Sequence, residues 1–285
     1  MVIREIEAAA VLTRSKLPAS DYCINPYVGC AHGCAYCYAR FMRRFTGHSE
    51  PWGAFVDVRT NAAAVLARQL RRHPPPGVVL LGSVTDCYQP AERKHEVTRA
   101  ILKVLTASEL SVSILTKSDL VLRDIDILKE LPKCEVGLTV TGLDDGVSSG
   151  FEPLASSATG RLNALQRLKA AGLRTYAFVG PILPGFTDVA AVVRKVAPAT
   201  DFVMFEALNT SCGNAAALDA LLRSKYPSIR DDFLRLAKSS EYWDEIEEVA
   251  SVACRDTGTM MAGFFRHARR AGTSTRGRPR RGDGG

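Results

Sequence analysis

The sequence of 285 residues lacks any run of about 18 uncharged apolar residues, which is the length that a helix needs to cross a bilayer. Its first eighteen residues, MVIREIEAAAVLTRSKLP, carry acidic side chains and lack the apolar core of a secretory signal peptide. A disulfide framework is also missing, because three of the eight cysteines are clustered and the others are scattered. We therefore expect a cytoplasmic protein with no membrane partner, whose thiols bind metal or take part in chemistry.

The positive charge of the chain is unevenly distributed. The formal net charge is +7, but residues 269–285, RRAGTSTRGRPRRGDGG, hold six arginines and one aspartate. This tail therefore carries five of the seven net charges, and the rest of the chain has only +2. The Arg/Gly composition without large apolar residues predicts a disordered tail, either a solvated extension or an arm that attracts phosphate.

The middle of the chain alternates short apolar runs with amphipathic segments, which predicts six β/α units. Continuous apolar strands separated by helices indicate a parallel sheet that is covered on both faces. Right-handed crossovers wind such a sheet into a barrel or a doubly wound sheet. Strands are expected over 22–26, 78–84, 111–117, 134–141, 174–182 and 202–209, and helices over 61–72, with Asn61 as its N-cap, 93–106, 121–131, 157–171 and 188–197.

Four segments follow from this pattern. We expect an N-terminal segment over 1–19, a β/α barrel over 20–210, a helical C-terminal extension over 211–268 and the tail over 269–285. The segment after Ala215 contains no further clear strand. Polar residues gather where the predicted strands end, and in β/α barrels that edge carries the site.

The strongest motif is GCAHGCAYC, which places Cys30, Cys34 and Cys37 at C-x3-C-x2-C spacing. With eight cysteines placed at random, about 0.006 such matches are expected, so the pattern is not accidental. Four-iron clusters are normally held by four thiolates, and three leave one iron open to an outside ligand. The alternative is a structural zinc site in which His32 or His48 completes the three thiolates.

The motif, with Tyr36 directly before the last cysteine and a position after the first β/α strand, resembles the radical S-adenosylmethionine (SAM) superfamily. The stretches CINPYVGCAHGCAYCYARF, GSVTDCYQPAE, LTKS, FEP and GPILPG are similar to its spore photoproduct lyase-like branch. This resemblance implies a partial (β/α)6 TIM-like barrel, a [4Fe-4S] cluster and SAM as cofactors, and an electron donor such as flavodoxin or ferredoxin. One electron from the cluster would cleave SAM to a 5′-deoxyadenosyl radical that abstracts hydrogen from a substrate.

The resemblance also implies roles for individual residues. The metal ligands are Cys30, Cys34 and Cys37. Ser83 and Asp86 lie where the superfamily holds the amino group of SAM, and Lys117 matches a lysine that approaches its carboxylate. The remaining positions expected near the cofactor are Tyr36, Thr139, Thr141 and Gly180.

The substrate side of the site is less clearly marked. Tyr38 occupies the position of a tyrosine that is proposed to relay a radical in the lyase family. The hydrogen-donating cysteine of that family is replaced by Ser83, which puts thymine-dimer repair in doubt. Cys87 and Cys212 follow predicted strands and are the candidate thiols, with packing as the alternative for both. Glu152 is a candidate for a hydrogen bond to substrate or cofactor.

The resemblance predicts a radical SAM enzyme, of lyase or transferase type, that acts on a nucleoside, nucleotide or nucleic acid. The alternatives are a DNA photoproduct lyase proper and a radical SAM step in natural-product biosynthesis. A different class remains open, a zinc-stabilised protein that binds nucleic acid through its arginine tail.

Overall fold

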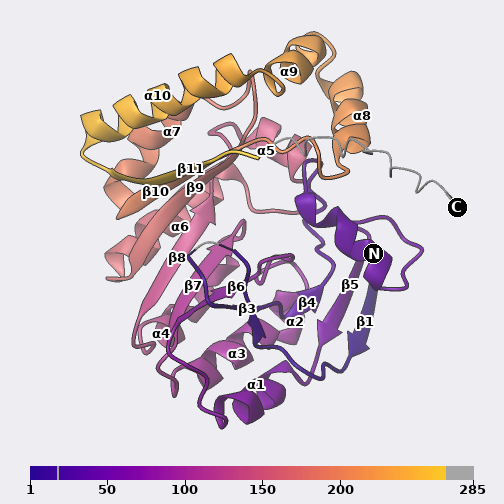
Figure 1. Ribbon diagram of the computed structural model, residues 1–285, viewed down its shortest axis with the longest axis vertical. Helices are drawn as coiled ribbons and strands as arrows, with labels where there is room; N and C mark the ends of the chain where they lie inside the picture. The colour runs from indigo at the N-terminus through magenta and orange to yellow at the C-terminus, as the bar shows by residue number, and fades with distance from the viewer. Residues whose placement is uncertain (18, 268–285) are drawn as a thin grey trace, which may run out of the picture.

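A computed structural model describes residues 1–17 and 19–267 of the chain, so the predicted tail over 269–285 lies outside the described residues. The centre of the protein is an eight-stranded sheet with the strand order β11-β10-β9-β8-β7-β6-β3-β2 (Figure 1). All neighbouring strands are parallel except the short pair β2 and β3. The strands are β2 Thr13–Arg14, β3 Tyr22–Ile24, β6 Val78–Leu81, β7 Ser111–Thr116, β8 Cys134–Thr139, β9 Arg174–Ile182, β10 Phe202–Ala207 and β11 Met260–Phe265.

The strand order distinguishes a barrel from a doubly wound sheet. From β3 to β11 the spatial order of the strands follows their order in the sequence, without the reversal that defines a doubly wound fold. Successive crossovers therefore wind in one direction, as in a TIM barrel. Within the described residues no pairing joins β11 to β2, so the barrel is open. The predicted α/β fold with a partial barrel is confirmed.

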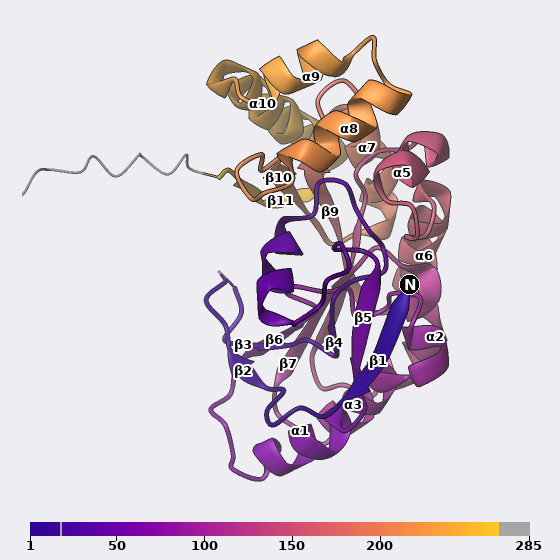
Figure 2. The same ribbon diagram turned by 90° about the vertical axis from the view of Figure 1, so that its right-hand side faces the viewer.

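Helices on the outside of the sheet cover its convex face, where the core lies. Figure 2 shows α2, α3, α5 and α6 along one side of the molecule, with the N-terminal strands and loops beside them. Side chains such as Val79, Ile114, Val136 and Val203 are completely buried beneath the helices. The helices are α1 Ala62–Leu70, α2 Glu92–His95, α3 Val97–Leu105, α4 Ile125–Leu128, α5 Asp145–Phe151, α6 Ala158–Ala170 and α7 Val189–Val196, with 3-10 helices η1 Tyr38–Phe45, η2 Asp119–Asp124 and η3 Ala197–Ala199.

The C-terminal extension differs from its prediction. It contains the helices α8 Ala215–Lys225, α9 Arg230–Leu236 and α10 Ser240–Thr257, but it returns as the strand β11, which pairs parallel to β10. The expectation of no further strand after Ala215 was wrong, because the run MMAGFF is short and contains Gly263, which weakens its strand signal. Helix α10 packs on α7 and β11, so the extension adds a seventh β/α unit rather than a separate layer (Figure 1).

A second sheet in the N-terminal part was also missed. The strands β1 Val2–Ile6, β5 Phe55–Arg59 and β4 Tyr27–Val28 pair in the order β1-β5-β4. Because β4 follows β3 after two residues, this small sheet lies beside the first barrel strand. Residues expected to form a separate N-terminal segment are therefore part of the structure that supports the cysteine loop.

Two local predictions were wrong for identifiable reasons. The helix expected over 93–106 is broken at Glu96, which has a left-handed φ of 49°, so α2 and α3 are separate. Asn61 precedes α1 but does not cap it with its side chain, because its amide bonds the main-chain N–H and oxygen of Ala8 instead. None of the described helices has the length and apolar character required to span a membrane.

Candidate functional site: a cysteine loop at the barrel mouth

The three clustered cysteines lie on the loop that runs from β4 to η1. Cys30 and Cys34 are buried and Cys37 is half-buried, and none of them is in a disulfide. Burial raises the pKa of the Cys30 thiol to about 12, with further increases from Asp86 and Cys37. Buried thiols on one loop that form no disulfide need a cation to become thiolates, which is what a metal cluster supplies.

Glycines let this loop approach its support closely. Gly29 has a φ of +84°, and a Cβ atom there would lie 2.4 Å from the main-chain oxygen of Phe55. A Cβ at Gly53 would lie 2.9 Å from the Cα of Gly33. Both contacts are possible only without a side chain, so the backbone around the cysteines is shaped by glycine.

Gln89 fixes the loop on both sides of the first cysteine, a role that the sequence did not reveal. Its Oε1 accepts a hydrogen bond of 2.7 Å from the Ala31 N–H, and its Nε2 donates to the Gly29 oxygen at 3.3 Å and to the Thr85 hydroxyl at 3.1 Å. Gln89 is fully buried. A lone glutamine on a loop after a strand carries no recognisable sequence signal, so only the fold identifies it.

Asp86 lies at the same strand edge, where it holds the ends of two strands together. Its carboxylate accepts from the Thr116 hydroxyl at 2.7 Å and from the main-chain N–H groups of Lys117 and Tyr88, both at 2.8 Å. The His32 Nδ1 lies 3.4 Å from the same group. Asp86 is thus brought to the cysteine loop as predicted, but its oxygens already have protein donors.

Lys117 extends into the space beside Cys34 without a carboxylate partner. Among the described residues no acidic oxygen lies within 4.0 Å of its ammonium, which lies 5.7 Å from the centre of the Tyr36 ring. Burial opposes its charge, but the negative fields of Cys34, Glu152 and Asp86 outweigh burial and raise the Lys117 pKa. A half-buried cation of this kind provides a place for an anionic group of a ligand.

Behind Tyr36 lies a fully buried ion pair. Arg161 donates to Glu152 and to the Ser148 hydroxyl, and it bonds the Thr139 main-chain oxygen at 2.9 Å. The Tyr36 hydroxyl donates to the second oxygen of Glu152. Glu152 therefore has protein partners on both oxygens, and the structure places it as an internal support of Tyr36 rather than at an open surface.

The other predicted cofactor residues differ in their surroundings. The Ser83 hydroxyl accepts from Asn25 Nδ2 at 3.0 Å. Thr139 and Thr141 are both buried near the carboxyl end of β8. Gly180 has no free space above it, because a Cβ there would lie 2.3 Å from the Phe178 ring.

The two candidate thiols on the substrate side lie in different places. Cys87 is completely buried, and burial with the charges of Asp86 and Glu92 raises its pKa strongly. Cys212 is half-buried, and its thiol donates to the Asn209 oxygen at 3.3 Å. Burial raises the Cys212 pKa, a main-chain hydrogen bond opposes this, and the field of Cys37 adds a smaller increase. The segment that carries Cys212 contacts the cysteine loop, because Asn214 Nδ2 donates to the Tyr36 oxygen at 2.8 Å.

Tyr38 and two residues that the sequence did not indicate complete this side. Tyr38 is 45% exposed and donates from its hydroxyl to the Ser83 oxygen. Burial raises its pKa, with smaller contributions from Cys37 and Glu206. A carboxylate oxygen of Glu206 on β10 lies 3.1 Å from the His267 Nε2, within hydrogen-bond distance. The alternation of side chains along β10 identifies Glu206 only after the sheet is known.

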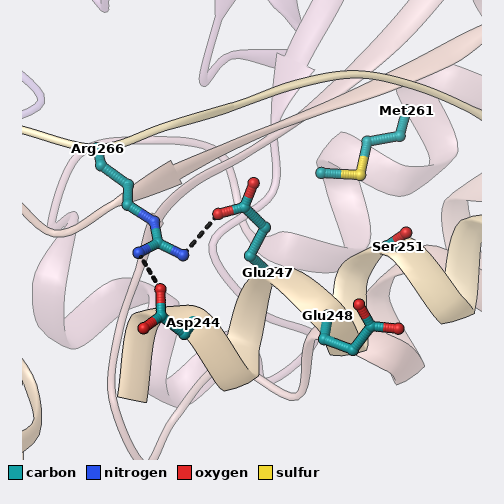
Figure 3. Close-up of a pocket in the computed structure, with 6 residues that line it drawn as sticks. All are labelled: Asp244, Glu247, Glu248, Ser251, Met261 and Arg266. Atoms are coloured by element: carbon teal, nitrogen blue, oxygen red, sulfur yellow. Dashed lines mark hydrogen bonds and ion pairs between the residues drawn. The ribbon is translucent and has the colours of Figure 1, made fainter. Parts of the chain in front are cut away.

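Arg266 fixes the end of β11 so that the next residue can reach Glu206. Figure 3 shows its guanidinium between Asp244 and Glu247 of α10. The nitrogen-to-oxygen distances are 2.6 Å to Asp244 and 2.5 Å to Glu247. These residues line a cavity of about 340 Å³. Arg266 also bonds the Trp243 oxygen at 2.9 Å. Since consecutive residues of an extended chain point to opposite sides, this clamp turns His267 toward the barrel interior.

The residues present suit an iron-sulfur cluster with an open position. Three cysteines lie on one glycine-shaped loop, and the Lys117 ammonium lies near Cys34. Among the described residues, the buried His32 Nε2 has no hydrogen-bond partner. In the described part of the chain, no group of three or more His, Cys, Asp or Glu side chains lies close enough together to hold a single metal ion. His48, a candidate zinc ligand, is bonded at Nδ1 to Glu50 and at Nε2 to Asp57.

Comparisons with known proteins bear on this site. The family description "Radical SAM superfamily" matches residues 24–194. The uncharacterised protein MJ0683 of Methanocaldococcus jannaschii is 35% identical over 244 residues, which are 86% of this chain and 91% of that protein. The uncharacterised protein Rv2578c of Mycobacterium tuberculosis is 34% identical over 173 residues, 59% of this chain and 51% of its own length. The chain thus matches about half of this mycobacterial relative.

Solved structures show the same fold. Spore photoproduct lyase complexed with dinucleoside spore photoproduct superimposes with a TM-score of 0.69 at 18% identity, over 92% of this chain and 82% of the lyase. SuiB of Streptococcus suis bound to S-adenosylmethionine gives a TM-score of 0.54 at 11% identity, over 86% of this chain and 50% of that chain. With the cysteine loop, its open barrel and the family match in agreement, the chain belongs to the radical SAM superfamily of enzymes.

Proposed function

We propose that this chain binds a [4Fe-4S] cluster through Cys30, Cys34 and Cys37, holds SAM beside it, and abstracts hydrogen from a nucleoside, nucleotide or nucleic-acid substrate. The observation that carries this proposal is the position of the three clustered thiols. They lie on one loop at the carboxyl ends of parallel strands, beside an ammonium without an acidic partner. In barrels of this kind that edge is where ligands bind.

The residues around the loop have distinct tasks in this proposal. When bound, the cluster and SAM supply one-electron cleavage of the sulfonium and a carbon-centred radical. Lys117 neutralises the SAM carboxylate, because its half-buried ammonium is charged and has no acidic partner of its own. Asp86 keeps the strand ends and the Lys117 main chain in place, and Gln89 holds the loop. The closed packing around Cys30 and Cys34 excludes water from the reacting atoms.

On the substrate side, Tyr38 and Cys212 are the groups that we assign to radical transfer. Tyr38 is half-exposed and adjacent to the third cysteine, and Cys212 is half-buried on a segment that contacts the loop through the bond from Asn214 to the Tyr36 oxygen. Cys87 is the weaker candidate because its completely buried thiol has no route to a substrate. Glu206 and His267 can orient polar groups of the substrate through hydrogen bonds.

The substrate class rests on the fold neighbour that binds a dinucleoside photoproduct. The missing donor cysteine at Ser83 favours a reaction other than photoproduct repair, and a step in natural-product biosynthesis is the second possibility. Ferredoxin or flavodoxin is the proposed source of the electron. The reaction is of lyase or transferase type.

The test starts with anaerobic purification and reconstitution with iron and sulfide. We expect about four iron and four sulfide per chain, and formation of 5′-deoxyadenosine from SAM after addition of dithionite. Cys34→Ala should lose iron, whereas Cys134→Ala, at the start of β8, should retain it. A colourless protein that binds one zinc would contradict the proposal. Turnover in deuterated water with candidate nucleosides, compared between Cys212→Ala and Cys87→Ala, identifies the thiol that donates hydrogen.

A further inference from the structure

The helix η1 presents a group of exposed aromatic rings directly after the third cysteine. Tyr38 is 45% exposed, Phe41 43% and Phe45 66%. Phe265 is the other aromatic residue of the described ranges that is exposed to this degree, at 38%. Three of four exposed aromatic side chains thus fall within the eight residues of η1, so their exposure is a local feature and not a general property of the surface.

The geometry of a 3-10 helix places these side chains in a row. With three residues per turn, positions i and i+3 are eclipsed, so Tyr38, Phe41 and Arg44 follow one another along one side of η1. The guanidinium of Arg44 lies 4.6 Å from the centre of the Phe45 ring and 5.8 Å from that of Phe41. We call these four residues, together with Arg40 and Arg43 of the same helix, the η1 face. It begins at the cysteine loop and leads away from it.

The η1 face also carries positive charge that is not neutralised. In the described part of the chain, Arg40, Arg43 and Arg44 have no carboxylate within 4.0 Å. Arg40 donates to the Cys34 oxygen and Arg43 to the Glu50 main-chain oxygen, which orients both guanidinium groups but leaves their charge. Residues 38–49 contain no acidic side chain. A polyanion is therefore the partner that this surface attracts.

We propose that the η1 face binds a single strand of nucleic acid, with bases on its aromatic rings and phosphates at its arginines. Successive side chains of the row are about 6 Å apart along the helix axis, because they are three steps apart and each step rises about 2 Å. Nucleotides in one strand of B-DNA are 3.4 Å apart, so bases that meet successive rings must be unstacked, as in a single strand. The inference rests on the proposed function, and it adds the surface that leads a strand to the radical site.

An acidic protein such as a flavodoxin is the competing partner. Charge alone would suffice to attract such a protein. Three exposed rings within one short helix contribute most to binding a partner in which every unit has a flat aromatic face. A single strand uses both features of the η1 face, so we favour it. The competing partner becomes one outcome of the experiment.

The experiment measures fluorescence anisotropy of a labelled twelve-residue oligothymidine with the full chain. Phe41→Ala should weaken binding roughly 5- to 100-fold, the effect of losing one stacked base. The control Leu154→Ala removes an equally exposed apolar side chain from another loop and should leave binding unchanged. Arg44→Gln should reduce the slope of log affinity against log salt by about 0.7, and Arg235→Gln, which removes the same charge from α9, should not. The arginine tail is identical in all four variants.

The outcomes separate this inference from the proposed function. Equal oligothymidine affinity in Phe41→Ala and Leu154→Ala overturns the inference, even if 5′-deoxyadenosine is still formed. The inference is likewise overturned if Phe41→Ala leaves oligothymidine binding intact and weakens only reduction by flavodoxin. If Phe41→Ala weakens oligothymidine binding but the reconstituted chain forms no 5′-deoxyadenosine, the nucleic-acid surface stands and the radical SAM chemistry fails.

Discussion

The buried pair of Glu152 and Arg161 allows a quantitative prediction for the site. Both side chains are fully buried, and the carboxylate binds Arg161, the Tyr36 hydroxyl and the Ser148 hydroxyl. Glu152→Gln keeps the shape but removes the charge, which leaves the Arg161 guanidinium buried without an anion. Breaking a buried pair in this way costs about 3–5 kcal/mol of the free energy of unfolding. We expect a loss of this size for Glu152→Gln.

The assay is urea unfolding of the cluster-free protein at neutral pH, followed by circular dichroism. Glu248→Gln is the control, because its partner Arg255 and Glu248 itself are 63% and 70% exposed, and such pairs contribute little. The double variant Glu152→Gln with Arg161→Met should recover part of the loss, since it removes both the charge and its need for a partner. A loss below about 1 kcal/mol in Glu152→Gln would refute the reasoning.

The same pair predicts a dependence on pH. Burial raises the Glu152 pKa, but Arg161 and Lys117 outweigh it, so the pKa in the folded protein lies below the usual value. The stabilisation is therefore complete above the pKa of the unfolded chain, about 4.3, and is lost as the pH falls through the folded pKa. Wild-type protein should lose stability in this acid range more steeply than Glu152→Gln, and equal slopes would contradict the assignment.

Three further predictions concern other parts of the molecule. Lys117→Met should weaken SAM binding to the reconstituted protein about 10- to 100-fold in calorimetry without reducing its iron content, because only an anion-binding charge is lost; unchanged affinity would remove Lys117 from the cofactor site. Gly29→Ala should lower iron incorporation, since its Cβ would meet the Phe55 oxygen at 2.4 Å, and full incorporation would show that the loop can move. Hydrogen bonds from Arg99 lower the Asp126 pKa to about 2, so Arg99→Gln should return it toward 3.8 in an NMR titration, and a pKa that stays near 2 would assign the shift to another group.

Patterns that depend on neighbours in the sequence were predicted well. The six parallel strands of the barrel were expected from their apolar runs, and the cysteine loop from its spacing. The strand β11 was missed because a short run that contains a glycine gives a weak signal until β10 offers an edge to pair with. The small sheet was missed because its strands come from separate parts of the chain, and a pairing between such strands cannot be seen in either one alone.

For the site, the sequence by itself determined which residues are able to bind a cluster, since thiolate spacing on one loop is a local property. Only the tertiary structure decided which distant groups meet that loop. It brought Gln89, Lys117 and Cys212 to the loop, buried Cys87, and turned Glu152 inward toward Arg161. The physical reason is that the burial and partners of a side chain depend on how the sheet twists and which helices cover it, and these are properties of the whole packed chain rather than of any short segment.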